Sequence, residues 1–320
     1  FVKMLIYNFL AFAGQLPAGI ILDRLASKWE KATSAAASAG CLLCLAAFAS
    51  GADSHTLVIT AGIGNALFHV GSGAEILKLY RGRAAEPGIF VSTGAFGIYA
   101  GSVIPMIDRL YVPAGVILSA LLAYSIILIL SEKEKPPADR SEYHDNVRVR
   151  KKFSLSAVQE AISVVCLILV AAFRSFEGSV FAFPWNSSIY TGIALTGAVF
   201  LGKMLGGMSS DRFGGCRTAA VSLAVSALLL GMSDQMGAGL AGVVLFNMTM
   251  PVTLSTLYRK FPEYPAASFG ILTFALYLGV LPVFAGVPEW MRSPASYTIL
   301  TVISLVLILS LIHISEPTRL

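Results

Sequence analysis

Residues 14–24 read GQLPAGIILDR, and residues 202–212 read GKMLGGMSSDR. Both stretches follow the pattern G-x4-G-x3-D-R, 188 positions apart, and both lie where a long apolar run meets a charged loop. A second repeat relates residues 79–101 to residues 257–279. Its identical positions include Leu79, Tyr80, Arg81, Pro87, Tyr99 and Gly101, each of which recurs 178 positions later. A duplicated hydrophobic chain indicates a membrane protein built from two similar halves, an organisation typical of transporters.

The composition agrees with a membrane protein. Apolar residues make up 56% of the chain and charged residues 13%, which is too little polar surface for a soluble protein of 320 residues. Long apolar runs recur, each about long enough to cross a hydrocarbon core of ~30 Å, and in lipid each must be a helix. They lie near residues 2–22, 33–50, 56–77, 88–107, 111–130, 155–177, 189–208, 218–233, 237–256, 266–286 and 296–310. The sequence therefore predicts an all-α integral membrane bundle with about eleven transmembrane helices.

The positive charges predict the orientation of these helices. Seventeen lysines and arginines lie in the loops on one side of the predicted spans, and only Lys3, Arg109, Arg174 and Arg292 lie on the other. The rich side is cytoplasmic by the positive-inside rule. We therefore expect a multi-pass protein of the cytoplasmic membrane, and the net charge of +5 reflects this topology and implies no nucleic-acid partner.

The repeats divide the chain into two transmembrane halves. The first covers residues 1–131 and the second residues 154–308, and residues 132–153 form a charged linker with two prolines that we expect to be cytoplasmic. The second half has six predicted spans and the first has five, which predicts that the first helix of the first half is missing. Residues 309–319 read LSLIHISEPTR, which resembles a translated sequencing adapter, so 309–320 are interpreted as a non-native tail.

Two six-helix halves, a charged cytoplasmic linker and G-x3-D-R after the second helix of each half resemble the major facilitator superfamily. Residues 207–214, GMSSDRFG, match the loop motif of that family closely, whereas the first copy departs from it at Ala26, where the family has glycine. The resemblance implies an expected twelve-helix fold, a monomer and secondary transport by alternating access. Residues 66–71, ALFHVG, look like the fourth helix of fosmidomycin-resistance-type drug exporters, which implies efflux by an antiporter.

The repeated motif predicts a gate. Asp23 and Asp211 lie near the cytoplasmic ends of helices, where a carboxylate can sit by the positive N-terminus of a neighbouring helix and pair with a basic side chain. Glycines one turn earlier let helices approach closely. The predicted cytoplasmic gate consists of Gly19, Asp23, Arg24, Gly207, Asp211 and Arg212. The alternative is a pair of ordinary loop charges that contribute little.

Polar side chains inside the spans are the candidate cavity, because polar groups in hydrocarbon usually face a cavity or a partner. At 100° per residue, Asn65, His69 and Ser72 form one stripe, and Glu75 lies close to it. The repeat relates His69 to Asn247 in the second half, as expected for a site between the halves. The alternative is hydrogen bonding between helices, with Glu75 paired only to Lys78. A kink is expected at Pro251.

Three further residues are candidates with two interpretations each. Arg174 either binds an anion or couples protons at the mouth of the cavity, or it forms an ion pair with Glu177 at the outer interface. Tyr99 and Tyr277 occupy matching places in the two halves, where a tyrosine either lines a cavity or packs and anchors at the interface.

Catalytic signals are missing from the sequence, which contains no HExxH, paired-aspartate metal motif or phosphate-binding loop. We therefore expect no enzyme, no cofactor and no bound metal. The sequence favours a secondary active transporter whose partners are a small molecule, protons and the lipid bilayer, with uptake and efflux both open. The alternatives are a transport-inactive membrane receptor or sensor on the same fold, and an intramembrane enzyme.

Overall fold

The computed structural model describes residues 2–49, 54–103, 119, 120, 122, 123, 126 and 157–315, and the elements assigned within these ranges are all helices. In the first half they are α1 (Val2–Asn8), the π-helical segment η1 (Phe9–Ala13), α2 (Gln15–Ala26), α3 (Ala32–Ala49), α4 (Ser54–Leu79) and α5 (Ala85–Val103). In the second half they are α8 (Ala157–Val180), α9 (Ile189–Phe213), α10 (Gly215–Leu230), α11 (Met236–Asn247), α12 (Thr249–Lys260), α13 (Pro265–Ala285), the 3-10 turn η4 (Glu289–Met291) and α14 (Pro294–Ser315).

The described helices are those of a multi-pass membrane protein. Eight helical stretches are long and apolar enough to cross a bilayer, by length and composition, and α10 is a shorter apolar helix. Large apolar side chains on the outside of the bundle, such as Ile98 and Leu228, are each 72% exposed, as suits contact with lipid. Each predicted span from 2–22 to 88–107, and from 155–177 to 296–310, contains a described helix. The predicted span at 111–130, apart from a few residues, and the linker 132–153 lie outside the described residues.

Local sequence explains several helix ends. Helix α9 begins at a capping box, in which the Ser188 hydroxyl accepts from the Thr191 amide at 3.2 Å and the Thr191 hydroxyl accepts from the Ser188 amide at 3.1 Å. It ends before Gly214, whose φ of +89° few other residues adopt. Helix α13 begins at Pro265, since proline needs no amide partner in the first turn. Helix α14 continues to Ser315, so the proposed tail starts within a helix.

The kink predicted at Pro251 is present as a break. Proline has no amide hydrogen, so the carbonyl four residues earlier, that of Asn247, loses its helical partner. Helix α11 ends at Asn247 and α12 begins at Thr249. The Thr249 hydroxyl donates to the carbonyl of Phe246 at 2.9 Å, so a side chain binds one of the carbonyls at the break.

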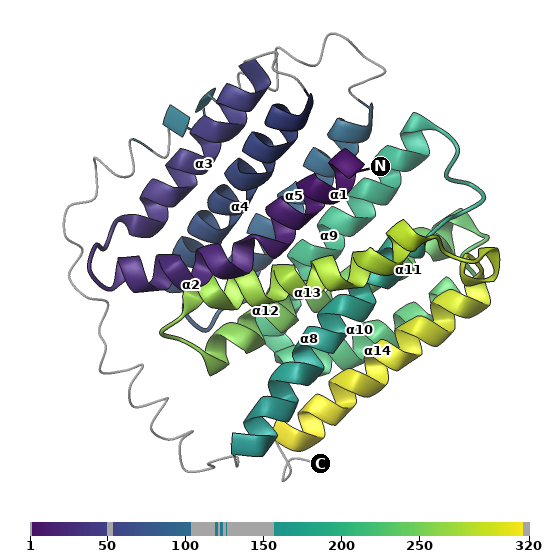
Figure 1. Cartoon of the computed structure of the whole chain (residues 1–320). Coiled ribbons are helices and arrows are strands. Elements are labelled where there is room, and N and C mark those ends of the chain that lie inside the picture. Colours follow the sequence, from purple (N-terminus) through teal and green to yellow (C-terminus); the bar gives the residue numbers. More distant parts are fainter. Residues whose placement is uncertain are drawn as a thin grey trace.

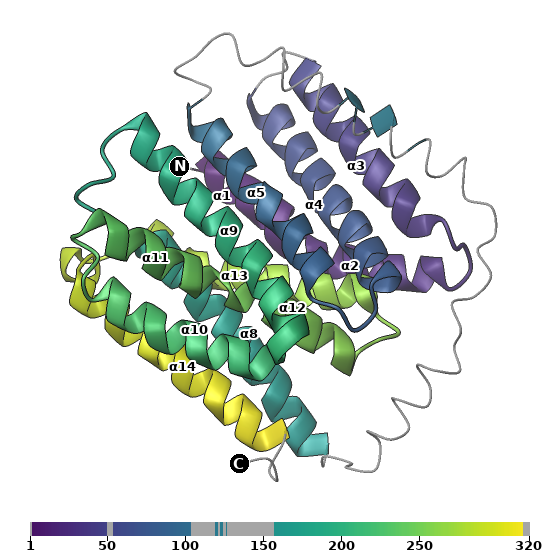
Figure 2. The same cartoon turned by 180° about the vertical axis from the view of Figure 1, so that it is seen from behind.

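The two halves meet along two seams, which are visible in Figures 1 and 2. Helix α5 of the first half packs along α9 of the second, and α2 of the first half packs along α13 of the second. A shared apolar core joins them, in which Leu22 and Leu77 from the first half cluster with Leu257 and Phe269 from the second.

Candidate functional site

Asp23 binds the beginning of a helix in the opposite half. Its Oδ1 accepts from the amide of Ala266 at 3.0 Å, and its Oδ2 accepts from the amide of Ala267 at 2.8 Å. These amides lie in the first turn of α13, where helix geometry leaves N–H groups without an intrahelical partner. The positive end of the helix dipole attracts the carboxylate as well.

Asp211, in the second half, caps a helix of the first half in the same way. Its two oxygens accept from the amides of Ala84 at 2.7 Å and Ala85 at 2.9 Å, at the start of α5. Each repeat therefore contributes one carboxylate that caps a helix of the other half. The two caps differ by one turn relative to the repeated proline, because Asp211 binds residues that precede Pro87, whereas Asp23 binds residues that follow Pro265. We call the end of the bundle that holds both carboxylates the latch end.

The glycines of the motif allow this close contact. A Cβ atom added at Gly207 would lie 2.9 Å from the Cα of Ala85, and one added at Gly19 would overlap the backbone of Ala266. Residues four apart lie on one face of a helix, so glycine and aspartate of G-x3-D reach the same two neighbouring residues. The spacing of the motif is thus explained by one helix start resting on the glycine while the carboxylate caps it.

The predicted pairing of these carboxylates with basic side chains is absent from the described part of the chain. Its ion pairs within 4.0 Å are Lys78–Glu75, Arg83–Glu86 and Arg292–Glu289. Both oxygens of each aspartate are already used by backbone amides, and Arg24 and Arg212 are exposed. Arg212 lies over the ring of Phe213, with its guanidinium carbon 5.5 Å from the ring centre.

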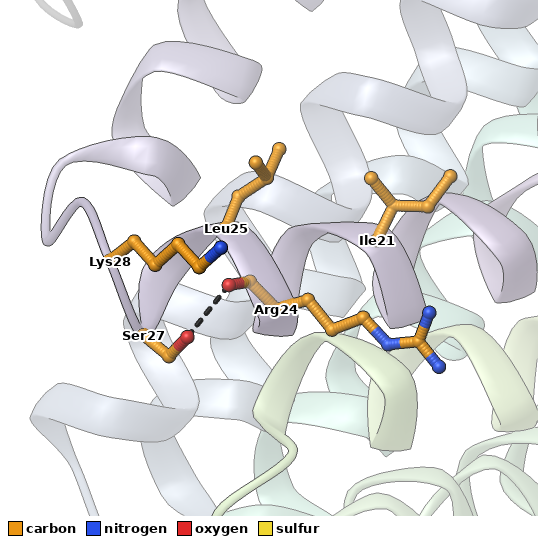
Figure 3. Close-up of a pocket in the computed structure, with 5 residues that line it drawn as sticks. All are labelled: Ile21, Arg24, Leu25, Ser27 and Lys28. Atoms are coloured by element: carbon orange, nitrogen blue, oxygen red, sulfur yellow. Dashed lines mark hydrogen bonds between the residues drawn. The ribbon is translucent and has the colours of Figure 1, made fainter.

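Arg24 instead belongs to a surface pocket beside α2. Figure 3 shows the residues that line this pocket, which are Ile21, Arg24, Leu25, Ser27 and Lys28. The Ser27 hydroxyl donates to the carbonyl of Arg24 at 2.7 Å, while the guanidinium extends away from Ser27 and Lys28. All five residues come from the end of one helix and the turn that follows it, so this pocket does not lie between the halves.

The polar stripe predicted on α4 divides between two neighbours. The Asn65 amide donates to the hydroxyl of Tyr7 in α1 at 3.2 Å. Glu75 accepts from the hydroxyl of Thr33 in α3 and lies 3.5 Å from the Nζ of Lys78, which also donates to Thr33 at 3.1 Å. Asn65 and Glu75 thus make the hydrogen bonds between helices that were the alternative interpretation, and the role of the stripe as a cavity wall stays a prediction. Glu75 makes the pair with Lys78 that was the alternative interpretation.

His69 faces the seams. Its ring centre is 6.0 Å from that of Phe90 in α5, and Phe90 is 6.1 Å from Phe269 in α13. This chain of rings runs from the first half into the second. Ser72, three residues further along α4, is half-buried. His69 thus lies between the halves, and its role in a cavity stays a prediction.

Lys203 is a residue at the centre that our sequence analysis missed. It lies within α9, and its Nζ donates across the α5–α9 seam to the carbonyl of Val91 at 3.4 Å. His69 packs on Phe90, the residue that precedes Val91 on α5, so His69 and Lys203 approach the same stretch of α5 from opposite halves. The signal was present in the sequence, since a lysine inside the predicted span 189–208 is a costly residue that usually has a function.

Arg174 is buried, with 6% of its surface exposed, and its Nε makes no hydrogen bond. Glu177 is fully buried, and its Oε1 accepts from the hydroxyl of Thr301 in α14 while its Oε2 has no partner. The two side chains are not within the 4.0 Å of an ion pair. The interpretation of Arg174 as half of an Arg–Glu pair at the outer interface is therefore wrong, because Glu177 is bound to α14 and Arg174 lies inside the bundle.

Asn247 lies beside the helix that carries Lys203. It is 8% exposed, and its amide donates to the carbonyl of Val243 in its own helix at 2.9 Å. A Cβ atom added at Gly202 would lie 2.8 Å from the Cβ of Asn247, so the break after α11 packs directly on α9. Asn247 is thus buried against α9 with a partner for its amide nitrogen, and its role in a substrate site stays a prediction.

Tyr99 and Tyr277 join the halves along the seams. The Tyr99 hydroxyl donates to the carbonyl of Ile189 at 2.8 Å, and a Cβ atom added at Gly192 would overlap the ring of Tyr99. The ring centre of Tyr277 is 5.9 Å from that of Phe9. Each tyrosine therefore packs against the opposite half, and the contact of Tyr99 lies at the start of α9, away from the latch end.

Comparison with known proteins gives the fold its name. No family model matches the sequence, and no curated protein matches it. Among solved structures, a variant of the E. coli fucose:proton symporter FucP is similar with a TM-score of 0.67 and 12% identity, over 99% of this chain and 92% of that one. The chain has the fold of the major facilitator superfamily.

Two more solved structures share this major facilitator fold. FucP in the outward conformation is similar with a TM-score of 0.64 and 15% identity, over 99% of this chain and 91% of that one. The proton:xylose symporter XylE, bound to 6-bromo-6-deoxy-D-glucose, has a TM-score of 0.60 and 14% identity, over 95% of this chain and 85% of that one.

Within the major facilitator fold, the predicted residues lie at separate levels. Gly19, Asp23, Gly207 and Asp211 join the halves at the latch end. His69 and Lys203 approach the same stretch of α5, Arg174 is buried in α8, and Asn247 packs beside the helix that carries Lys203. Asn65, Glu75 and the arginines Arg24 and Arg212 belong to neither group. The structure thus separates the contacts of the latch end from the buried charges inside the bundle.

Proposed function

We propose that this chain is a secondary active transporter of the major facilitator superfamily, which moves a small molecule across the cytoplasmic membrane by alternating access and couples that movement to protons. The observation that carries the proposal is the pair of caps at the latch end. One carboxylate from each repeat binds the first amides of a helix in the opposite half. Two symmetric, crossing contacts at one end of a two-part bundle are what a closed gate requires.

The strength of these contacts suits a gate that opens. Hydrogen bonds to charged groups contribute roughly 1.5–3 kcal/mol each, less when they are exposed to water. Asp211 is exposed and Asp23 is half-buried, so the two caps together hold the halves by a few kcal/mol. A conformational equilibrium of that size is shifted by the binding free energy of a small molecule.

The latch end is cytoplasmic in our proposal, because the loops at this end belong to the side rich in lysine and arginine. A closed latch then blocks the central charges from the cytoplasm. The conformation described here corresponds to the part of the cycle in which the cytoplasmic gate is shut. The linker 132–153 would lie on the same side.

Two considerations bear on coupling and direction. The similar solved proteins are named as proton symporters of fucose and xylose, which supports proton coupling and a small polar substrate here. Residues 66–71 resemble a helix of drug exporters, which favours proton antiport and efflux. We propose proton coupling. Uptake by symport and efflux by antiport are distinguished by whether protons move in the same direction as the solute or in the opposite direction.

Counterflow in proteoliposomes tests the proposal. Vesicles with the full-length protein are loaded with one solute of a panel, which includes D-fucose, D-xylose and D-glucuronate, and uptake of the same labelled solute is followed. We expect one solute to exchange without ATP and to move protons, reported by a pH-sensitive dye inside the vesicles. A solute that binds the purified protein but never exchanges would show a receptor instead of a carrier.

A further inference from the structure

Two positive charges share the centre of the bundle. Lys203 is half-buried and Arg174 is buried. The Nζ of Lys203 binds the carbonyl of Val91, and Val91 packs against the apolar cluster that contains Ala171, one helical turn before Arg174 on α8. Among the described residues no carboxylate lies within 4.0 Å of either one. Burying like charges without a counter-ion is costly, so their joint presence calls for a negative group that is not part of these residues.

Glu177 is the carboxylate nearest along the chain to Arg174, and it does not serve as that counter-ion. Its Oε1 accepts from the hydroxyl of Thr301, which itself donates also to the carbonyl of Tyr297 at 2.8 Å. This network directs the carboxylate toward α14, and the Nε of Arg174 has no hydrogen-bond partner. Thr301 is fully buried, so the network is shielded from water.

The charges lie near the middle of the membrane span. At 1.5 Å per residue, Lys203 lies about 21 Å from the start of α9, and His69 lies about 22 Å from the start of α4. Both helices end at the latch, so the two residues are at the same depth in opposite halves. Arg174 lies nearer the other end of α8, and long side chains on a helix lean toward its N-terminus, which for α8 is the latch end.

We infer, building on the transport function proposed above, that Lys203 and Arg174 bind the anionic group of the transported molecule, with His69 facing them from the first half. The break between α11 and α12, which packs on Gly202 and Gly206 of α9, lies beside this site. Substrate sites in transporters commonly form next to such interrupted helices near the membrane midplane.

Binding of an anion at Lys203 also affects the contact between α5 and α9. The Nζ of Lys203 donates at 3.4 Å to the carbonyl of Val91, on the α5 helix that Asp211 caps. A bound carboxylate or phosphate competes for that Nζ, because a charge-assisted hydrogen bond is stronger than one to a neutral carbonyl. Anion binding therefore weakens one contact between the halves at the level of the substrate.

This inference departs from the similar solved structures, whose named substrates, fucose and xylose, carry no charge. A neutral sugar binds through hydrogen bonds and cannot neutralise two buried cations. The class of molecule expected here is a small organic anion, such as a sugar acid or a phosphate ester. Matched acid and neutral sugars therefore make a sharp test.

Thermal unfolding of the purified full-length protein provides that test, with D-glucuronate, D-glucose and inorganic phosphate as probes. We expect D-glucuronate or phosphate to raise the Tm and D-glucose to leave it unchanged. Lys203→Met and Arg174→Met are each expected to weaken anion binding about tenfold or more, whereas Lys203→Arg retains it. Protection by D-glucose equal to that by D-glucuronate, or no protection by either anion, would overturn the inference.

A second measurement needs no ligand. If Lys203 and Arg174 repel each other in the empty site, then Lys203→Met and Arg174→Met should each raise the Tm of the unliganded protein. Lys78→Met is the matched control, because Lys78 has a carboxylate partner and its loss should lower the Tm. A lower Tm for both central variants would show structural roles and contradict the inference.

The two proposals fail in different ways. Anion-specific binding without counterflow of any anion would remove the carrier function and leave the anion site. Counterflow of neutral solutes alone, unchanged in Lys203→Met, would leave the carrier function and remove the anion site.

Discussion

At the scale of single residues, the aspartates of the repeated motif act through backbone amides and not through a neighbouring arginine. Each places both oxygens on the first amides of a helix in the opposite half, at 2.7–3.0 Å. The contact needs an acceptor with two oxygens and a negative charge, since the helix start offers two donors and a positive dipole. Asparagine keeps the shape but supplies a single acceptor and an NH2 group.

Asp211→Asn should therefore weaken the latch by roughly 1–3 kcal/mol and shift the protein toward the state open at the latch end. A reporter is Ser92→Cys in a background without the four native cysteines, because Ser92 is fully buried on α5, about two turns below the cap. Labelling of this cysteine from the latch side should increase. Asp234→Asn, which changes an exposed carboxylate outside the latch, is the control and should leave labelling unchanged.

Gly207→Ala should also open the latch, because the new Cβ would collide with the backbone of Ala84 and Ala85. Overpacking of this kind costs about 1–3 kcal/mol. Gly197→Ala on the same helix is the matched control, since a Cβ there meets nothing within 4 Å and alanine favours helix. The Tm of Gly207→Ala should be lower than that of Gly197→Ala. Equal Tm values for the two variants would show that close approach at Gly207 is unimportant.

At the residue scale, the sequence predicted features that depend on neighbouring residues of the motif. The motif itself indicated that Asp23 and Asp211 cap helices and that the glycines allow close contact. The identity of the capped amides was not readable, because Asp23 and Ala266 are 243 positions apart. Arg174 was recognised as a candidate, but its lack of a partner depends on Glu177 binding Thr301, a contact across 124 positions.

At the scale of elements, α5 is held against α9 by contacts at two levels. Asp211 caps its first residues, and Tyr99 near its other end donates to the carbonyl of Ile189 at 2.8 Å. Because the two contacts lie at opposite ends of α5, we expect the loss of either one to favour opening of the bundle at its own end. The seam α2–α13 has the corresponding cap at Asp23 and the ring contact between Tyr277 and Phe9.

Tyr99→Phe should shift the protein in the opposite direction from Asp211→Asn. The substitution removes one hydrogen bond of about 1 kcal/mol and keeps the ring that packs on Gly192. Labelling of Ser92→Cys with a reagent added on the side opposite the latch should rise, while labelling from the latch side should fall. Rising labelling from both sides would indicate general loosening and argue against coupled gates.

Helix positions were predictable from sequence because apolar length and composition determine them, as the agreement from α2 to α5 and from α8 to α14 shows. The break at Pro251 followed from a missing amide hydrogen. The π-helical segment Phe9–Ala13 was not predicted, since its sequence is as apolar as any helix around it and carries no proline. The division of the α4 stripe depended on which neighbours supply Tyr7 and Thr33, which only packing decides.

At the scale of the whole molecule, the orientation that we propose rests on the distribution of positive charge. The loops on the latch side carry most of the lysines and arginines, so a topology reporter fused at Ala138 should read as cytoplasmic, and one fused at Asp234 as external. The reporter pair of alkaline phosphatase and a fluorescent protein gives opposite signals on the two sides. An external signal at Ala138 would reverse the proposed orientation and place the latch outside.

The central claim is that the halves alternate about the central charges, with the latch and the opposite end opening in turn. Electron–electron distances between spin labels test it most directly, with one pair at Arg24 and Glu263 on the latch side and another at Ser102 and Asp234. All four positions are exposed in this structure. In Asp23→Asn with Asp211→Asn, the first distance should lengthen while the second shortens. If both distances stay unchanged, or both lengthen together, the halves do not alternate and the account is contradicted.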